Sequence, residues 1–161
     1  MFEMVGIRHR YGAVTAVDVP EWRAAAGDAW LLAGQSGSGK STVLHILAGL
    51  TRPTVGSVIV GGTDLAALTE SERDRWRGRN VGLVPQRLHL VGALGVRDNL
   101  RLAQTLAGLA VDDAHAAQAL ELLRGQAIEV GATLVVASHD ARVKSLLPNS
   151  FVLPASEGGH R

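Results

Sequence analysis

A glycine-rich stretch with a single lysine restricts the fold of this chain more than any other feature. The stretch consists of Gly34, Gln35, Ser36, Gly37, Ser38, Gly39, Lys40, Ser41 and Thr42. It fills every fixed position of the pattern G-x-x-x-x-G-K-[ST]. A short apolar run at 29–33 precedes it, and an apolar-faced segment at 43–50 follows it. This order predicts a buried strand, a glycine turn and a helix N-terminus, whose backbone N–H groups and dipole attract anions.

The chemistry of this motif indicates a binder of nucleoside triphosphates. The Lys40 ammonium can reach the β- and γ-phosphates, and the Ser41 hydroxyl can ligate Mg²⁺. The alternative is a flexible glycine turn that happens to contain a lysine. That alternative fits less well, because both flanks match the expected strand and helix.

Length and composition limit the class of protein. The 161 residues suit one domain with a real core, and 47% of them are apolar. The net charge of +1 points to neither nucleic acid nor an anionic membrane, so we expect no nucleic-acid partner. The sequence contains no cysteine, no signal-peptide core and no apolar run of the ~18 residues that span a membrane. We therefore expect a cytoplasmic protein whose membrane association would depend on a partner.

Apolar periodicity and turn residues predict an α/β domain. Strands are expected over 1–7, 13–19, 29–33, 57–60, 81–85, 133–137 and 150–153. Helices are expected from Lys40 to about Gly49, from a Thr69–Glu72 capping box to about Arg77, over 95–107, and from Asp112 past Ala127. A polar turn at 8–12 and a stop at Pro20 should end the first two strands.

This alternation of strands and helices indicates a mainly parallel core sheet. The early strands at 1–7, 13–19 and 57–60 have short connections, which indicate an N-terminal antiparallel β patch beside that core.

Three further motifs occur in a fixed order around the glycine-rich stretch. Tyr11 lies upstream of it, Val84-Pro85-Gln86 ends a later strand, and Ser138-His139-Asp140 ends another. This order resembles that of the ATP-binding cassette (ABC) ATPases, most of all the branch that powers lipoprotein release and macrolide-type export. The resemblance covers residues 2–147, with one large gap. It implies a P-loop NTPase core within a single ABC-type nucleotide-binding domain over 1–161, with ATP and Mg²⁺ as cofactors.

The resemblance implies a role for each matching residue. Tyr11 corresponds to the aromatic residue that stacks on adenine, and a ring on a short turn suits that contact. Gln86 corresponds to the glutamine that reaches Mg²⁺ and the attacking water, and His139 to the histidine that contacts the γ-phosphate. Taken singly, these would be a packed tyrosine, a surface glutamine and a structural histidine. Their register with the P-loop favours the functional roles.

One part of the family pattern is missing from the sequence. Between Gln86 and His139, ABC ATPases carry a signature loop of the form L-S-G-G-Q, a Walker B strand that ends in Asp-Glu, and a D-loop. None of these occurs in 87–138, and the nearest match, 122–126, lacks the serine and one glycine. Segments that should lie far apart are joined near Arg124-Gly125, which corresponds to an internal deletion of roughly fifty residues.

This deletion affects both the sheet and the chemistry. One core strand would be missing, and the sheet would be less stable or would close by pairing the strands that end at Pro85 and Ala137. The missing Asp-Glu pair normally holds Mg²⁺ and positions the attacking water, so hydrolysis should be slow or absent even where ATP binds. Asp140 could replace the lost aspartate, although its context fits the histidine loop better. Glu129, expected in mid-helix, is a weaker replacement.

The resemblance also implies partners. A separate membrane permease would hold the protein at the inner face of the plasma membrane, with 87–100 as the expected contact. ABC ATP sites are completed across a dimer by the partner's signature loop, so a homodimer of this chain would complete none. A full-length ABC ATPase partner could complete one at Lys40. Two alternatives stay open: a non-hydrolysing nucleotide-binding or regulatory protein, and a degenerate remnant of the family.

Overall fold

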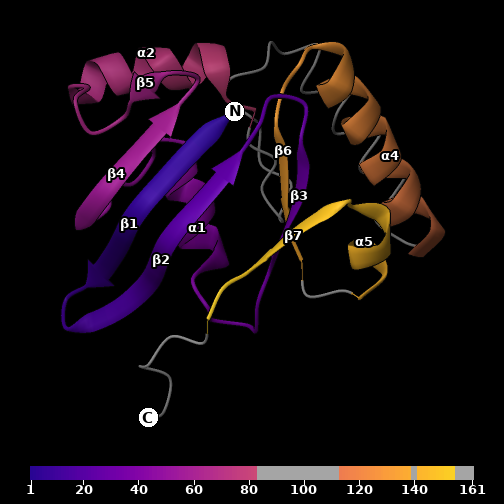
Figure 1. Ribbon diagram of the computed structural model, residues 1–161, viewed down its shortest axis with the longest axis horizontal. Helices are drawn as coiled ribbons and strands as arrows, with labels where there is room; N and C mark the ends of the chain where they lie inside the picture. The colour runs from indigo at the N-terminus through magenta and orange to yellow at the C-terminus, as the bar shows by residue number, and fades with distance from the viewer. Residues whose placement is uncertain (83–112, 139–140, 155–161) are drawn as a thin grey trace.

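The computed structural model describes residues 1–82, 113–138 and 141–154. Two sheets lie on either side of the short helix α1 (Lys40–Leu47), as Figure 1 shows. Helices α4 (Asp113–Glu129) and α5 (Ala141–Leu146) lie beside the second sheet, on the side away from the first. This arrangement confirms the predicted α/β fold with an antiparallel patch next to a parallel sheet.

The first sheet is antiparallel and has the strand order β2-β1-β4-β5. Its strands are β1 (Phe2–Tyr11), β2 (Val14–Ala24), β4 (Val55–Val60) and β5 (Thr63–Asp64). The predicted polar turn over 8–12 is wrong, because β1 continues to Tyr11 and the turn is limited to Gly12 and Ala13. Arg8 is stabilised in the strand by an ion pair with Asp18, which faces it on β2. The Arg8 Nη2 and the Asp18 Oδ2 lie 2.9 Å apart.

The predicted end of the second strand at Pro20 is also wrong. β2 passes through this residue and continues to Ala24. Among the described strands β2 pairs with β1 alone, so it lies at the edge of its sheet. A proline is tolerated at a sheet edge, because its missing N–H leaves no ladder bond unmade. The sequence pattern could not reveal that this strand lies at an edge.

The second sheet is parallel and has the order β6-β3-β7 in the described part of the chain. Its strands are β3 (Ala29–Ala33), β6 (Leu134–Ala137) and β7 (Asn149–Val152). All three confirm strands predicted from apolar runs. Of the strand predicted over 81–85, Val81 and Gly82 are not in a strand and the remainder lies outside the described residues, as does the helix predicted over 95–107.

The helices agree with the sequence pattern, with one addition. α1 and α4 lie where they were predicted, and α2 (Glu70–Asn80) continues three residues past the expected end at Arg77. α5 was not predicted from the sequence. α4 runs without interruption through Arg124 and Gly125, the point at which the resemblance predicts that two family segments are joined.

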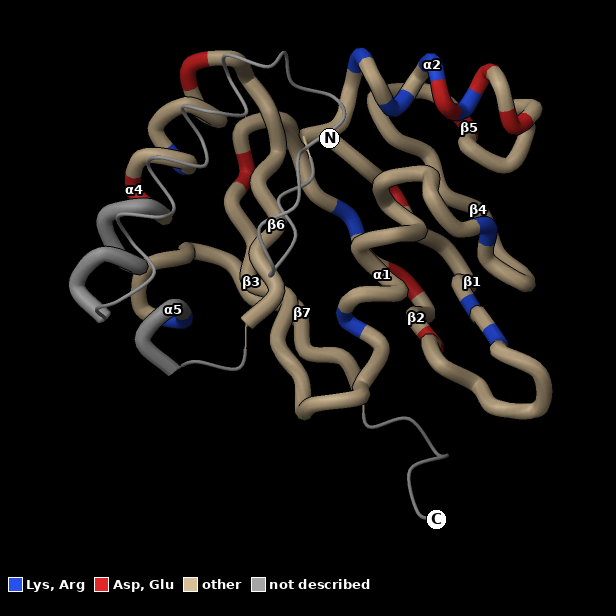
Figure 2. The backbone as a smooth tube through the Cα atoms, turned by 180° about the vertical axis from the view of Figure 1, so that it is seen from behind, with Lys and Arg blue, Asp and Glu red and all other residues tan. Residues whose placement is uncertain are grey.

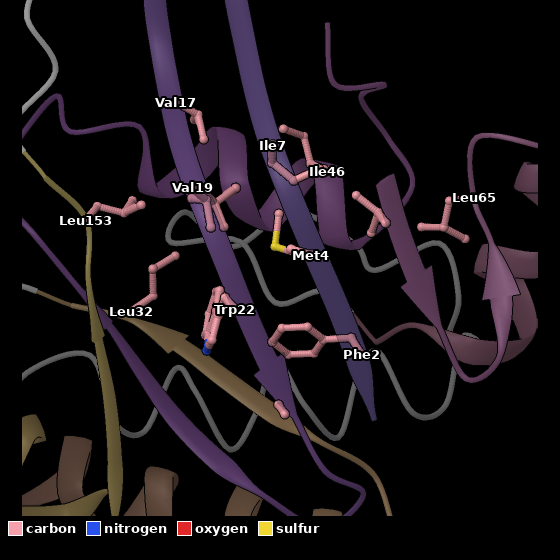
Figure 3. Packing of buried hydrophobic residues seen from close by; sticks show 13 residues of the cluster. Phe2, Met4, Ile7, Val17, Val19, Trp22, Leu32, Ile46, Leu65 and Leu153 are labelled. Atoms are coloured by element: carbon pink, nitrogen blue, oxygen red, sulfur yellow. The ribbon is translucent and has the colours of Figure 1, made fainter. Parts of the chain in front are cut away.

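The main core lies between α1 and the antiparallel sheet. Val43 and Ile46 of α1 are fully buried there, and Figure 3 shows Ile46 beside Met4 and Ile7 of β1. Burial of these side chains seats the helix, because each fully buried aliphatic side chain contributes about 1.5–3 kcal/mol. The N-terminus of α1, which begins at Lys40, is therefore held in place by apolar packing.

Trp22 of β2 links the two sheets through aromatic contacts. Its ring stacks on Phe151 of β7 with centroids 4.6 Å apart, and it meets Phe2 edge-on at 4.9 Å. A further edge contact joins it to Trp30 of β3 at 5.8 Å. Its side chain is buried, and its Nε1 has no hydrogen-bond partner in the described part of the structure. The tryptophan therefore acts through ring packing.

We expect Trp22→Ala to lower the free energy of unfolding by about 3–5 kcal/mol, because it leaves a large cavity between the sheets. Trp22→Phe should cost a small part of that, since a ring stays in place and no hydrogen bond is lost. Urea unfolding followed by circular dichroism measures both. Similar losses for the two variants would show that ring packing is not the main contribution.

Helix α2 begins with a capping box. The Thr69 Oγ1 and N each donate a hydrogen bond to the Glu72 carboxylate, at 2.6 and 2.9 Å, and the Glu72 N donates back to Thr69. These hydrogen bonds hold the pKa of Glu72 below its usual value, the Thr69 hydroxyl contributing most. The first turn of the helix carries the acidic Glu70 and Glu72 and the last turn the basic Arg77 and Arg79, so Figure 2 shows red toward one end of α2 and blue toward the other.

This lowered pKa predicts a pH dependence of stability. The ionised carboxylate stabilises the folded state above the ordinary glutamate pKa of ~4.3, and the contribution is lost as the pH falls below that value. The stability difference between the wild-type protein and Glu72→Gln should therefore be constant near pH 7 and shrink below about pH 4.5. Denaturation at a series of pH values measures it. A difference that does not change with pH would contradict the assignment.

Candidate functional site

The glycine-rich stretch leaves the carboxyl end of β3, the middle strand of the parallel sheet. Both neighbouring strands end beside it. The Leu153 N, just after β7, donates to the Ala33 carbonyl at 2.9 Å, and the Ser138 N, just after β6, donates to the Leu32 carbonyl at 3.3 Å. The carboxyl ends of parallel strands are where open α/β sheets bind ligands. The stretch therefore lies at the edge where a site is expected.

The loop is closed by its own lysine. The Lys40 Nζ donates hydrogen bonds to the carbonyl oxygens of Gly34 at 2.7 Å and Gln35 at 2.6 Å. The Ser38 N donates to the Gln35 carbonyl at 3.2 Å within the same turn. The ammonium is thus held over the loop, in front of the N-terminus of α1. A phosphate oxygen placed there would accept a hydrogen bond in which both donor and acceptor are charged, whereas the present carbonyl acceptors are neutral.

The hydroxyl groups of the stretch differ in exposure. Ser41, in the first turn of α1, is exposed, whereas Thr42 is buried. Ser36 is exposed, and Ser38 is buried with no hydrogen-bond partner for its Oγ in the described part of the chain. Ser36 and Ser41 therefore carry the hydroxyls of the stretch that solvent, a metal ion or a phosphate can reach, and Ser41 is the one in the first turn of α1.

Gly39 lies against the antiparallel sheet. The register of β1 and β2 shifts between His9 and Arg10, so that Ala16 is an extra residue in β2. The carbonyl of Ala16 comes so close that a Cβ built on Gly39 would lie 2.2 Å from its oxygen. Gly39 also has φ +89°, a left-handed conformation that favours glycine. A β-bulge in one sheet therefore contacts the loop that leaves the other.

Tyr11 lies at the carboxyl end of β1, next to the turn at Gly12 and Ala13. Its side chain is exposed, and its ring meets the ring of His9 edge-on, with centroids 4.7 Å apart. The bulge at Ala16 brings the same hairpin against Gly39. Tyr11 therefore belongs to the hairpin that contacts the P-loop. Neither Ala16 nor His9 could be recognised from the sequence, because neither belongs to a motif and a bulge leaves no residue pattern.

Three of the predicted site residues lie outside the described ranges. These are Gln86, His139 and Asp140. The chain does reach Ser138 beside Leu32, so the segment that carries His139 leaves β6 at the P-loop edge of the sheet. The structure thus places the hairpin that carries Tyr11 and the end of β6 beside the P-loop.

Glu129 lies at the opposite edge of the parallel sheet. It is the last residue of α4, which corrects its expected position in mid-helix. After it the chain enters β6 at the amino end of β3, where the Thr133 Oγ1 donates to the Ala25 carbonyl at 2.8 Å. The five residues of β3 separate the two edges by about 16 Å at ~3.3 Å per residue. Glu129 is therefore too far from the P-loop to replace a catalytic carboxylate.

The described residues contain no helix long and apolar enough to cross a membrane. Within the same ranges no cluster of three or more histidine, aspartate or glutamate side chains could hold a metal ion.

A protein-family model described as ABC transporter matches residues 17–141. The chain belongs to the ABC transporter family. The match begins at β2 and includes the P-loop, α4 and β6, so it covers most of the described structure. It confirms the resemblance seen in the sequence.

Individual relatives of this ABC protein agree with the branch expected from its sequence. The lipoprotein-releasing system ATP-binding protein LolD of Oleidesulfovibrio alaskensis is 40% identical over 101 residues, which are 62% of this chain and 44% of that protein. The macrolide export ATP-binding/permease protein MacB 1 of Aeromonas hydrophila is 38% identical over 128 residues, which are 77% of this chain and 20% of that protein. The chain spans less than half the length of the LolD relatives it matches.

The fold is that of solved ABC cassettes. A dimeric structure of the ATP-binding cassette MJ0796 bound to ADP and Pi superposes with a TM-score of 0.70 at 20% identity, covering 98% of this chain and 97% of that one. At this identity the likeness supports the fold alone.

Two glycines of the P-loop provide a matched test of the bulge contact. Gly37 (φ +80°) and Gly39 (φ +89°) share a left-handed backbone, but a Cβ on Gly37 would meet nothing within 4 Å. Gly37→Ala should cost about 1–2 kcal/mol of stability from backbone strain alone. Gly39→Ala should cost about 1–3 kcal/mol more, because its methyl group overlaps the Ala16 carbonyl. Equal losses in urea unfolding would contradict the close contact.

Proposed function

We propose that the chain is the ATP-binding subunit of an ABC transporter and binds Mg-ATP at the loop around Lys40. The observation that supports this most is the position of the Lys40 ammonium, held by two loop carbonyls at the N-terminus of α1. On binding, the triphosphate would take over hydrogen bonds that the lysine now makes to Gly34 and Gln35. The helix dipole adds further attraction for the anion.

The residues at this edge fit a magnesium ion that the nucleotide brings with it. Ser41 offers an exposed hydroxyl oxygen next to Lys40, and hard oxygen ligands suit Mg²⁺. Mg²⁺ usually keeps several waters and binds through one or two protein groups and substrate phosphates. Ser41, together with the predicted ligand Gln86, would hold the ion, which when bound neutralises phosphate charge. Tyr11 would stack on the adenine, and His139 would contact the γ-phosphate.

We propose that this site binds ATP but hydrolyses it slowly or not at all. The sequence lacks the Asp-Glu pair that would orient the attacking water, and a positioned base contributes about 10²–10⁴-fold. Glu129 lies at the far edge of the sheet, and Asp28 lies there too, just before β3 begins. Of the replacements weighed from sequence, Asp140 is left, next to His139 after β6.

An ATP-binding subunit of an ABC transporter requires partner proteins. We propose a separate membrane permease, contacted through 87–100, which would hold the chain at the inner face of the plasma membrane. We propose also a full-length ABC ATPase as the second half of a dimer, because this sequence carries no signature loop of its own. The partner's signature loop would complete the site at Lys40.

The second candidate is a non-hydrolysing nucleotide-binding protein with a regulatory role. The missing Asp-Glu pair favours it, whereas the intact P-loop argues against a remnant that has lost all binding. Measurements of Mg-ATP binding and of phosphate release distinguish an active ATPase, a non-hydrolysing binder and a remnant.

The test compares the two lysines of the chain, Lys40 and Lys144. Lys40→Ala should weaken Mg-ATP binding at least about tenfold, because it removes the cation that faces the phosphates. Lys144→Ala, at an exposed position of α5, should leave binding unchanged. Isothermal titration calorimetry measures binding, and phosphate release from Mg-ATP measures turnover on the same samples.

Lys40-dependent turnover by the chain alone would contradict the proposed loss of hydrolysis and would implicate Asp140. Binding without turnover would support the proposal, and co-purification of this chain with a full-length ABC ATPase in the presence of Mg-ATP would support the heterodimer. A wild-type chain that binds no nucleotide would overturn the proposed function and favour a remnant.

A further inference from the structure

His9 is a buried histidine without hydrogen bonds. Its side chain lies on β1 with 9% of the residue exposed, and in the described part of the chain neither Nδ1 nor Nε2 has a partner. A buried polar group without a partner costs free energy, so its presence calls for an explanation. The ring contact recorded for it is the edge-on contact with Tyr11, at 4.7 Å and an interplanar angle of 83°.

The strand geometry places His9 between the core and Tyr11. Residues two apart on a strand share a face, so Ile7, His9 and Tyr11 follow one another along the same side of β1. Along this series burial decreases from the fully buried Ile7 to the exposed Tyr11. The residue opposite His9 is Val17, whose Cγ2 would lie 2.9 Å from a Cβ on Gly39. His9 therefore joins Tyr11 to the part of the sheet that contacts the P-loop.

We propose that His9 is a positioning residue that orients the Tyr11 ring for stacking on the purine base of the bound nucleotide. The inference rests on the proposed function, because it requires a nucleotide at the P-loop. Tyr11 stands beside a two-residue turn and is 56% exposed, so solvent surrounds much of its ring. A base can stack only on a ring held in one orientation, and fixing a free side chain costs entropy on binding. The edge-on contact with His9 reduces that cost, because such aromatic pairs attract one another.

The missing hydrogen bonds indicate which property of His9 matters. Its nitrogens bond to nothing in the described residues, so its ring shape and edge carry the contact. His9→Phe should keep the contact, whereas His9→Leu fills a similar volume without an aromatic ring. Exposed His45 on α1 provides a control histidine away from this pair.

The experiment compares two ligands that share a triphosphate and differ in the base. Calorimetry would measure Kd for Mg-ATP and for Mg-tripolyphosphate with the wild-type chain and with His9→Leu, His9→Phe, Tyr11→Ala, His45→Leu and the double variant His9→Leu/Tyr11→Ala. We expect His9→Leu to raise the Kd for Mg-ATP about two- to tenfold, the range of an aromatic pair contact, and to leave Mg-tripolyphosphate unchanged. His9→Phe and His45→Leu should bind both ligands as the wild type does. In the Tyr11→Ala background, His9→Leu should have no further effect.

Each outcome bears on the proposal. Equal weakening of both ligands by His9→Leu would mean a structural role and would overturn it, as would unchanged binding of Mg-ATP. Additive effects of His9→Leu and Tyr11→Ala would also overturn it, because the histidine would then act without the tyrosine. All of these outcomes leave the proposed function intact while tripolyphosphate and ATP still bind. Failure of the wild-type chain to bind either ligand would overturn the proposed function and this inference together.

Discussion

The close approach of Gly39 to the Ala16 carbonyl joins the P-loop to the antiparallel sheet. A bulge in β2 presents that carbonyl, and only a residue without a Cβ leaves room for it. From this point α1 runs into the core with Val43 and Ile46 buried. Trp22 repeats the connection at a second place, where it stacks on Phe151 of the parallel sheet. The two sheets and the loop between them are therefore one packed unit, and the position of Lys40 depends on it.

This arrangement separates binding from catalysis. The groups that would hold phosphate belong to β3, the P-loop and α1, all of which have the support of the core. The groups that would activate water belong, in ABC ATPases, to a strand with no counterpart in this sequence. The one described acidic residue weighed as a replacement, Glu129, lies at the wrong edge of the sheet. The proposed phosphate site therefore has the support of the core whether or not the chain hydrolyses ATP.

The sequence could predict most elements because their signals are local. Apolar runs gave the strands at β3, β6 and β7, and the Thr69–Glu72 pair gave the start of α2. Two of the errors are at Arg8 and at Pro20, where residues typical of turns lie within strands. Arg8 is held there by Asp18 on the facing strand, and Pro20 is tolerated because β2 is an edge. Both reasons involve a neighbouring strand, which a local pattern cannot contain.

The sequence by itself determined the family through the order of its motifs, and the fold class through the alternation of strands and helices. It also predicted the phosphate-binding roles of Lys40 and Ser41, because nine consecutive residues form the P-loop pattern. Only the tertiary structure decided that Ala16 must face a glycine, that His9 meets the Tyr11 ring edge-on, and that Glu129 is remote from the site. Each of these depends on strand pairing or on which end of a strand a residue follows. Such relations arise when distant segments pack, so no spacing along the chain records them.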